Sequence, residues 1–201
     1  DTARIFAVMA LAHWHTFQVL TKRPEQMASL FRIGLSDWVH QAAFHLGEYR
    51  LLGERLRLDF PWPLPNVHLG VSVEDQATAD ARIPLLLRTP AAVRLVSYEP
   101  ALGPVDFAAW LTCRYHPVEP SSCACGMKLD WIVAGGESGP GARPPHPDWF
   151  RSARDQCAAA AVPFFFKQWG AWVEHPATPT RGKNNGAGLY VLRNGRLGNQ
   201  V

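Results

Sequence analysis

The sequence predicts an α/β fold, a partial (β/α) barrel-like (TIM-barrel-like) parallel sheet of about five strands that alternate with helices. Short, almost wholly apolar runs recur along the chain, and such runs are typical of parallel strands buried on both faces. Between them lie longer segments whose apolar residues recur at helical spacing. The chain has 201 residues, whereas a complete eight-stranded barrel needs roughly 250. Only part of a barrel therefore fits, and a doubly wound sheet is the competing architecture.

The N-terminal third predicts one strand among helices. Apolar side chains from Thr2 to Ala12 form one broad face, as expected of a helix. The β-branched and aromatic run Thr16–Leu20 predicts the first strand. A helix should follow from Pro24, because proline is favoured in a first helical turn. The next helix is expected from Ser36, a good N-cap residue, to Arg57.

Beyond three closely spaced prolines, apolar runs and helical patterns alternate regularly. Strands are expected at Val67–Val71, Val93–Val96, Leu129–Ala134 and Pro163–Phe166. Helices are expected at Asp75–Leu87, Val105–Leu111 and His146–Ala161. Near the end, Asn194-Gly195 predicts the turn of a hairpin over Leu189–Leu197. We therefore expect a barrel-like domain over residues 1–175 with an insertion at 112–128, followed by a polar tail or hairpin over 176–201.

The composition narrows the class of protein. Hydrophobic residues make up 47% and charged residues 18%, which indicates a packed core and argues against disorder. A net charge of +3 is too small to argue for nucleic-acid binding by itself. The longest apolar run, Cys157–Phe166, contains a proline and is too short to cross a bilayer, so we expect no membrane contact. The N-terminus lacks the pattern of a signal peptide, and a cytoplasmic protein is the expectation.

Ionic side chains follow the predicted strands at their carboxyl ends, which meet at one edge in parallel α/β folds. One interpretation is a pocket for a small polar ligand that bears both charge signs. The other is a ring of salt bridges that satisfies itself. Exposed ion pairs add little stability, so recurrence at five strand ends favours the ligand pocket. The candidates for its catalytic acids and bases are Lys22, Arg23, Glu74, Glu99 and Lys167.

A glycine-rich loop runs from Gly135 to Arg143 between a strand and a helix. Glycine lets backbone N–H groups approach an anion, and Arg143 is suited to clamp a carboxylate or phosphate. Glu137 in the same loop better suits an ammonium group or a ribose hydroxyl. A tight strand-to-helix turn is the alternative. The candidate cofactor-binding residues are Gly135, Gly136, Glu137, Ser138 and Arg143.

Four potential zinc ligands lie in the irregular insertion: Cys113, His116, Cys123 and Cys125. The Cys-Ala-Cys spacing is tighter than the usual pair of zinc ligands, so ordinary reduced thiols are the competing interpretation. Cys157 lies on the apolar face of a predicted helix and is expected in the core. Four cysteines in a chain of this length do not indicate a disulfide scaffold.

Five motifs resemble those of a known family in sequence and order. They are Phe17–Pro24, Leu69–Glu74, Val96–Pro100, Gly135–Pro144 and Phe165–Gly170. The family is phage-derived and of unknown function, is described as three-Cys-motif proteins, and is similar to a branch of the radical-SAM barrels. The resemblance extends over roughly residues 1–172. Ala171 departs from it, because an acidic residue is expected after Gly170.

The resemblance implies S-adenosylmethionine (SAM) and a [4Fe–4S] cluster, held by three cysteines of a segment upstream of the first strand. No cysteine of this chain matches that segment, so reductive cleavage of SAM is not expected of this chain alone. Binding of SAM or a substrate at the strand ends is expected. On this basis the loop residues Gly135–Ser138 would hold the polar end of the cofactor, and Arg143 would pair with its carboxylate.

The alternative function is a non-catalytic phage module that binds nucleic acid or protein. Basic residues in the tail and an aromatic content of 11% are the observations that favour it. The tail residues are Arg181, Lys183, Arg193 and Arg196. An incomplete barrel also exposes sheet edges, which would favour a homodimer.

Overall fold

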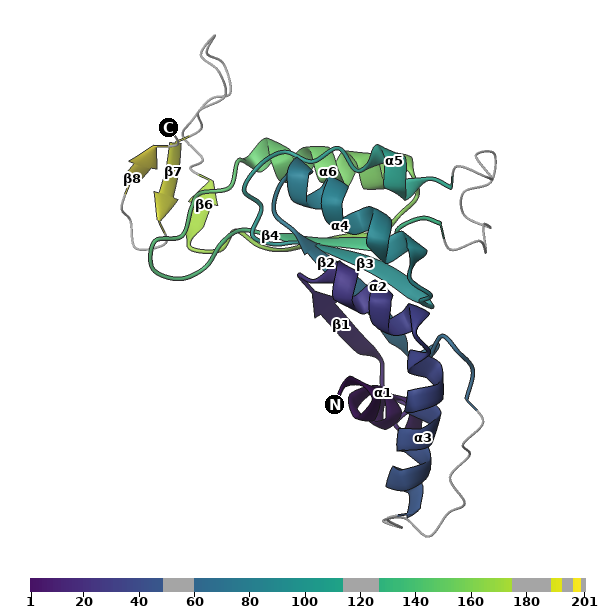
Figure 1. Cartoon of the computed structure of the whole chain (residues 1–201). Helices are drawn as coiled ribbons and strands as arrows, with labels where there is room; N and C mark the ends of the chain where they lie inside the picture. Colours follow the sequence, from purple (N-terminus) through teal and green to yellow (C-terminus); the bar gives the residue numbers. More distant parts are fainter. Residues whose placement is uncertain (49–59, 114–126, 175–188, 193–196, 200–201) are drawn as a thin grey trace.

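The computed structural model describes residues 1–48, 60–113, 127–174, 189–192 and 197–199 (Figure 1). Five parallel strands form the main sheet and follow one another in space in chain order. They are β1 (Phe17–Thr21), β2 (Val67–Val73), β3 (Val93–Tyr98), β4 (Trp131–Gly135) and β5 (Phe164–Gln168). The predicted α/β class, with five parallel strands that alternate with helices, is confirmed.

The described helices are α1 (Thr2–Leu11), α2 (Pro24–Arg32), α3 (Leu35–Glu48), α4 (Gln76–Arg88), α5 (Ala108–Leu111) and α6 (Pro147–Ala159). Helix α4 packs on β2 and β3, and α6 packs on β4 and β5. Ile83 of α4 and Phe150 of α6 lie in one apolar core with Val71, Tyr98 and Ile132 of the strands. In the described part of the chain, none of the helices has the length and apolar character that crossing a bilayer requires.

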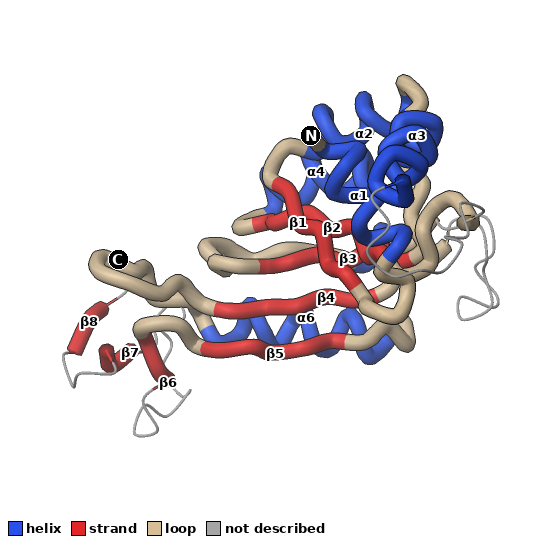
Figure 2. Tube along the Cα trace, turned by 90° about the horizontal axis from the view of Figure 1, so that it is seen from below, coloured by secondary structure: helices blue, strands red, loops and turns tan. Residues whose placement is uncertain are grey.

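The strand order distinguishes this sheet from a doubly wound one, because it never reverses. Right-handed crossovers in such a sheet place the connecting helices on the same face. In Figure 2, α6 lies behind β4 and β5. Consecutive barrel strands have the same arrangement. The described strands form an open sheet, since β1 and β5 each pair on one side only.

The opposite surface of the sheet, here called the open face, carries the alternate side chains of the strands. The register places Leu20, Gly70, Leu95 and Trp131 in one row across it, and Ser72, Ser97, Val133 and Phe165 in the next. Leu20 and Leu95 close over Gly70, where a Cβ would lie 3.0 and 2.7 Å from their nearest carbons. Leu20 and Phe165 are 47% and 56% exposed. The open face therefore presents apolar side chains to solvent.

A second, three-stranded sheet follows the main one in the chain. Its strands are β6 (Trp172–Glu174), β7 (Leu189–Leu192) and β8 (Leu197–Asn199), and they pair antiparallel in that order. The antiparallel pairing of β7 with β8 agrees with the predicted hairpin. Its turn, Asn194-Gly195, lies outside the described residues. Strand β6 has no counterpart among the predicted elements.

Some predicted element boundaries are wrong. Ser36 does not cap α3, because the helix begins one residue earlier at Leu35, which is buried. Gly34, with φ of +94°, makes the turn before it. Strands β2 and β3 extend two residues further than predicted, to Val73 and Tyr98, because their ends remain paired with each other. Residues 49–57, where the helix was predicted to continue, lie outside the described residues.

The N-cap of α4 offers a test of local stability. The Asp75 carboxylate accepts the Thr78 N–H at 2.8 Å, and this bond holds the pKa of Asp75 below its usual value. At neutral pH, Asp75→Ala should lower the free energy of unfolding in urea by about 1 kcal/mol. A carboxyl with a lowered pKa stabilises the fold above its unfolded pKa, so the difference should shrink as acid protonates Asp75.

Asp80→Ala, at an exposed acid on the same helix, is the matched control and should cost less than about 0.5 kcal/mol. Equal losses for the two variants at neutral pH would contradict the capping role of Asp75.

Candidate functional site

Glu74 follows β2 and is held by two cations. Its carboxylate accepts Lys22 Nζ at 2.6 Å and Arg82 Nη1 at 2.9 Å. Arg82 also donates to the backbone carbonyl of Ser72 at 2.7 Å, which ties α4 to the end of β2. The Glu74 side chain is 12% exposed, so this carboxylate is buried, paired and fixed.

Glu99 follows β3 and is bound more loosely. Its Oε2 lies 3.3 Å from Lys167 Nζ on β5 and 3.4 Å from Ser97 Oγ. Strand β4 lies between β3 and β5, but its residue at this level is Gly135, and a Cβ there would collide with the Glu99 carboxylate. The missing side chain of Gly135 is therefore what allows Glu99 and Lys167 to meet across an intervening strand.

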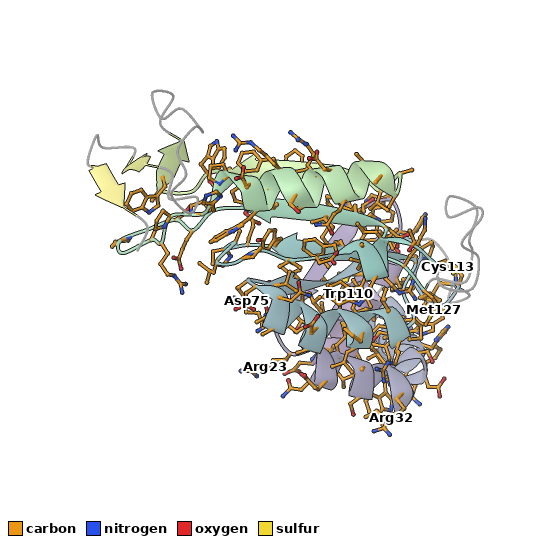
Figure 3. All side chains as sticks on the ribbon, turned by 90° about the horizontal axis from the view of Figure 1, so that it is seen from above. Arg23, Arg32, Asp75, Trp110, Cys113 and Met127 are labelled. Atoms are coloured by element: carbon orange, nitrogen blue, oxygen red, sulfur yellow. The ribbon has the colours of Figure 1, made fainter. Side chains whose placement is uncertain are left out.

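The strand register places the two acids side by side at the carboxyl edge, and their ion pairs bring the two lysines to them. Glu74 and Glu99 directly follow Val73 and Tyr98, which are register partners on strands roughly 4.8 Å apart. Lys22 and Lys167 lie on the outer sides of the two acids. We call Lys22, Glu74, Glu99 and Lys167 the ionic row. Arg23 is not part of it, since its side chain lies at the periphery and points outward (Figure 3).

The glycine-rich loop contains its own ion pair. Glu137 accepts Arg143 Nε at 2.9 Å, Nη2 at 2.7 Å and the Arg143 backbone N–H at 2.7 Å. These hydrogen bonds lower the pKa of Glu137 to about 2. They raise the pKa of Arg143, to which the charge of Glu74 also contributes. The anion that Arg143 binds in this structure is thus the carboxylate of Glu137.

The glycines of this loop serve close backbone packing. The Gly136 N–H donates to Gln168 O at 2.9 Å, and a Cβ at Gly136 would collide with the Trp169 carbonyl. Gly170 has a φ of +78°, and a Cβ there would collide with the Glu137 carbonyl. Ser138 Oγ accepts Gln168 Nε2 at 3.2 Å. These contacts agree with a tight strand-to-helix turn, and they align the loop with the end of β5.

The zinc prediction falls largely on residues outside the described part of the chain, where His116, Cys123 and Cys125 lie. Cys113 is buried beside the start of that segment (Figure 3). Cys157 is also buried, as predicted, and burial raises the pKa of its thiol to about 11. Within the described residues, no group of three or more His, Cys, Asp or Glu side chains is arranged to hold a metal ion.

Two supporting residues escaped the sequence analysis. Arg82 on α4 braces Glu74, and Trp172 on β6 donates its indole N–H to Ala142 O at 2.7 Å, which anchors the glycine-rich loop. Arg82 follows Glu74 by eight residues, which is about two helical turns. This spacing was a weak indication that the two side chains could meet. Nothing in the sequence near Trp172 indicated its partner.

The close contact at Gly170 predicts that an alanine substitution there destabilises the fold strongly. Gly170→Ala should lower the free energy of unfolding by about 2–4 kcal/mol, because it adds both backbone strain and a clash with Glu137 O. Gly141→Ala is the matched control, since Gly141 has a similar φ of +74° with no atom within 4 Å of a built Cβ. It should cost about 1–2 kcal/mol, from strain alone. Equal losses in urea denaturation would contradict the close approach.

The Glu137–Arg143 pair predicts an acid-shifted titration. Carboxyl-detected NMR should show Glu137 titrating near pH 2, and in Arg143→Gln its pKa should return toward 4.5. Because the pKa is lowered, the pair stabilises the loop above the ordinary pKa of the acid, and this contribution disappears as pH falls toward 2. A Glu137 pKa near 4.5 in the unmodified protein would contradict the pairing.

Comparison with known proteins places the chain in a family. The model of a family described as protein of unknown function (DUF5131) matches residues 2–196. No curated protein and no solved structure matches the chain. The resemblance to a family of unknown function is thus confirmed at that level, over nearly the whole sequence. The chain belongs to the DUF5131 family of proteins of unknown function.

Proposed function

We propose that the carboxyl edge of the main sheet binds the zwitterionic head group of a small ligand, with Glu99 and Lys167 as its principal contacts. The observation that carries this proposal is the loose Glu99–Lys167 pair, at 3.3 Å. Charge-assisted N–H···O bonds are normally about 2.7–2.9 Å long. The pairs of Glu74 with Lys22 and of Glu137 with Arg143 lie at 2.6 and 2.7 Å. Glu99 is therefore the acid of this edge with the most capacity for another donor.

The exposure of the two partners suits a ligand of both charge signs. The Glu99 side chain is 18% exposed, whereas that of Lys167 is 54% exposed. Glu99 is a fixed acceptor for an ammonium group, and Lys167 has a flexible stem whose ammonium can turn toward a carboxylate. An amino-acid head group supplies both partners. Glu99 is also placed to accept a proton from such a ligand, and Lys167 to donate one.

The other predicted site residues support this pair in different ways. Gly135 leaves room for Glu99, and the loop of Gly136, Glu137, Ser138 and Arg143 forms the wall beside it. Lys22 and Glu74 extend the charged edge toward β1. In this proposal Arg143 meets a ligand carboxylate only after releasing Glu137, so it contributes less than Lys167.

SAM is the ligand that the family resemblance implies, and its methionine portion is a zwitterion of this kind. The residues described do not fit an iron–sulfur cluster, because their two cysteines, Cys113 and Cys157, are buried and no group of three potential ligands is found among them. A radical-SAM-type reaction therefore enters the proposal only through the resemblance. The chemistry assigned to this chain is head-group binding and proton transfer.

A non-catalytic module that binds nucleic acid or protein is the second candidate. The basic residues that favour it, Arg181, Lys183, Arg193 and Arg196, lie outside the described residues. In the ionic row each lysine is paired with a glutamate, so the row offers a phosphate backbone no net positive charge.

Calorimetric titration with SAM tests the proposal. The unmodified protein should bind SAM, and Glu99→Gln should weaken binding by about tenfold or more, because it removes a charge-assisted contact. Lys167→Gln should act in the same direction. Methionine should compete for the site, since it carries the same head group.

Asp155→Asn is the control, as Asp155 is an exposed acid on α6, the helix that covers the opposite face of the sheet. Its affinity for SAM should equal that of the unmodified protein. Absence of heat with both SAM and methionine, or equal affinities in Glu99→Gln and Asp155→Asn, would refute the head-group site.

A further inference from the structure

We propose that the head-group site is selective for α-amino acids, and that Ser97 is the positioning residue behind this selectivity. The inference rests on the proposed function and deepens it, because it names the class of ligand and the atoms of Glu99 and Lys167 that the ligand meets. It follows from the different surroundings of the two Glu99 oxygens.

Protein donors reach only one oxygen of Glu99. Oε2 accepts Lys167 Nζ at 3.3 Å and Ser97 Oγ at 3.4 Å. Within the described residues, Oε1 has no donor. It is not among the buried, unpaired side-chain atoms of that part of the chain either, so solvent reaches it. Oε1 is therefore the oxygen that a ligand ammonium can approach without displacing a protein group.

The other acids that follow the strands have no such oxygen. Both oxygens of Glu74 accept a cationic side chain, at 2.6 and 2.9 Å. Both oxygens of Glu137 accept Arg143, at 2.7 and 2.9 Å. A ligand would have to break a charge-assisted hydrogen bond to reach any of these four oxygens. An ammonium group at this edge is therefore directed to Glu99.

Ser97 favours one orientation of the Glu99 carboxylate. It precedes Glu99 by two residues, which is the spacing of side chains on one face of a strand. It is buried, and its hydroxyl has no other acceptor in the part of the chain that the structure describes. A hydroxyl that donates to Oε2 leaves Oε1 open above Gly135, where a Cβ would collide with it. Ser97 therefore acts on a ligand through Glu99.

This arrangement selects ligands whose opposite charges are neighbours. Lys167 Nζ is bound to one oxygen of the Glu99 carboxylate, and Oε1 is the other oxygen of the same group. The cation and the open acceptor thus lie side by side. A ligand that contacts both without strain carries its ammonium and its carboxylate on one carbon, as an α-amino acid does. A ligand with these groups at the two ends of a flexible chain has to fold back, which costs conformational entropy.

Calorimetry of the full chain with norleucine and its isomer ε-aminocaproic acid tests the selectivity. The two molecules have the same composition and differ in the position of the amino group. Norleucine should bind at least about tenfold more tightly, because it contacts Glu99 Oε1 and Lys167 together without folding back. Equal affinities of the two isomers would overturn the inference.

Ser97→Ala tests the positioning role. The Glu99 carboxylate should then turn more freely, so the preference for norleucine over its isomer should fall about fivefold. Ser97→Thr keeps the hydroxyl and should restore the preference. Ser72→Ala is the matched control, because Ser72 is the register partner of Ser97 on β2 and is similarly buried. No contact joins its hydroxyl to Glu99 within the described residues, so the preference should stay unchanged.

The two proposals fail in different ways. Absence of heat with methionine refutes the head-group site, and this inference with it. Binding of methionine together with equal affinities for the two isomers overturns the selectivity alone. Equal preferences in Ser97→Ala and Ser72→Ala, when circular dichroism shows both variants folded, overturn the role of Ser97. A Ser97→Thr variant that behaves like Ser97→Ala does the same.

Discussion

The main sheet must bury one of its faces under α4 and α6, and this constraint determines the rest of the molecule. Val71, Tyr98 and Ile132 point into the helix-covered core, so every second residue of their strands points the other way. A slip of one residue would exchange the two sets and expose the core. The register that protects the core therefore also places Glu74 and Glu99 side by side and sets Trp131 and Phe165 on the open face.

The charged edge has two parts, which differ in how tightly their carboxylates are held. At β1 and β2, Glu74 is held on two sides by Lys22 and Arg82, and such a carboxylate serves structure. At β3 and β5, Glu99 and Lys167 meet loosely over Gly135. The absence of one side chain on β4 thus produces the more open part of the edge. This difference, rather than the number of charges, is why the proposed function centres on Glu99 and Lys167.

The sequence was sufficient to predict the five parallel strands and the ionic residues at their ends. Apolar runs indicate buried strands, and parallel strands end at a common edge of the sheet. It was insufficient to predict which side chains these ionic residues would pair with. Glu137 and Arg143 were both expected to face a ligand, yet these two residues, six positions apart in the loop, pair with each other. Within the described residues Glu99 Oε1 has no donor, and this too was invisible, since an unmet hydrogen bond depends on every neighbouring atom. Strand β6 and the Arg82 contact likewise depend on segments distant in the chain.

The internal counterion of the glycine-rich loop has a thermodynamic consequence. Glu137 and Arg143 tie the loop to itself, while Trp172 and the Ala171 N–H tie it to the following strand. The loop that follows Gly135 is therefore ordered by contacts within the protein itself. The ligand proposed for this edge would therefore lose little free energy to the ordering of this loop, because its conformation is set during folding.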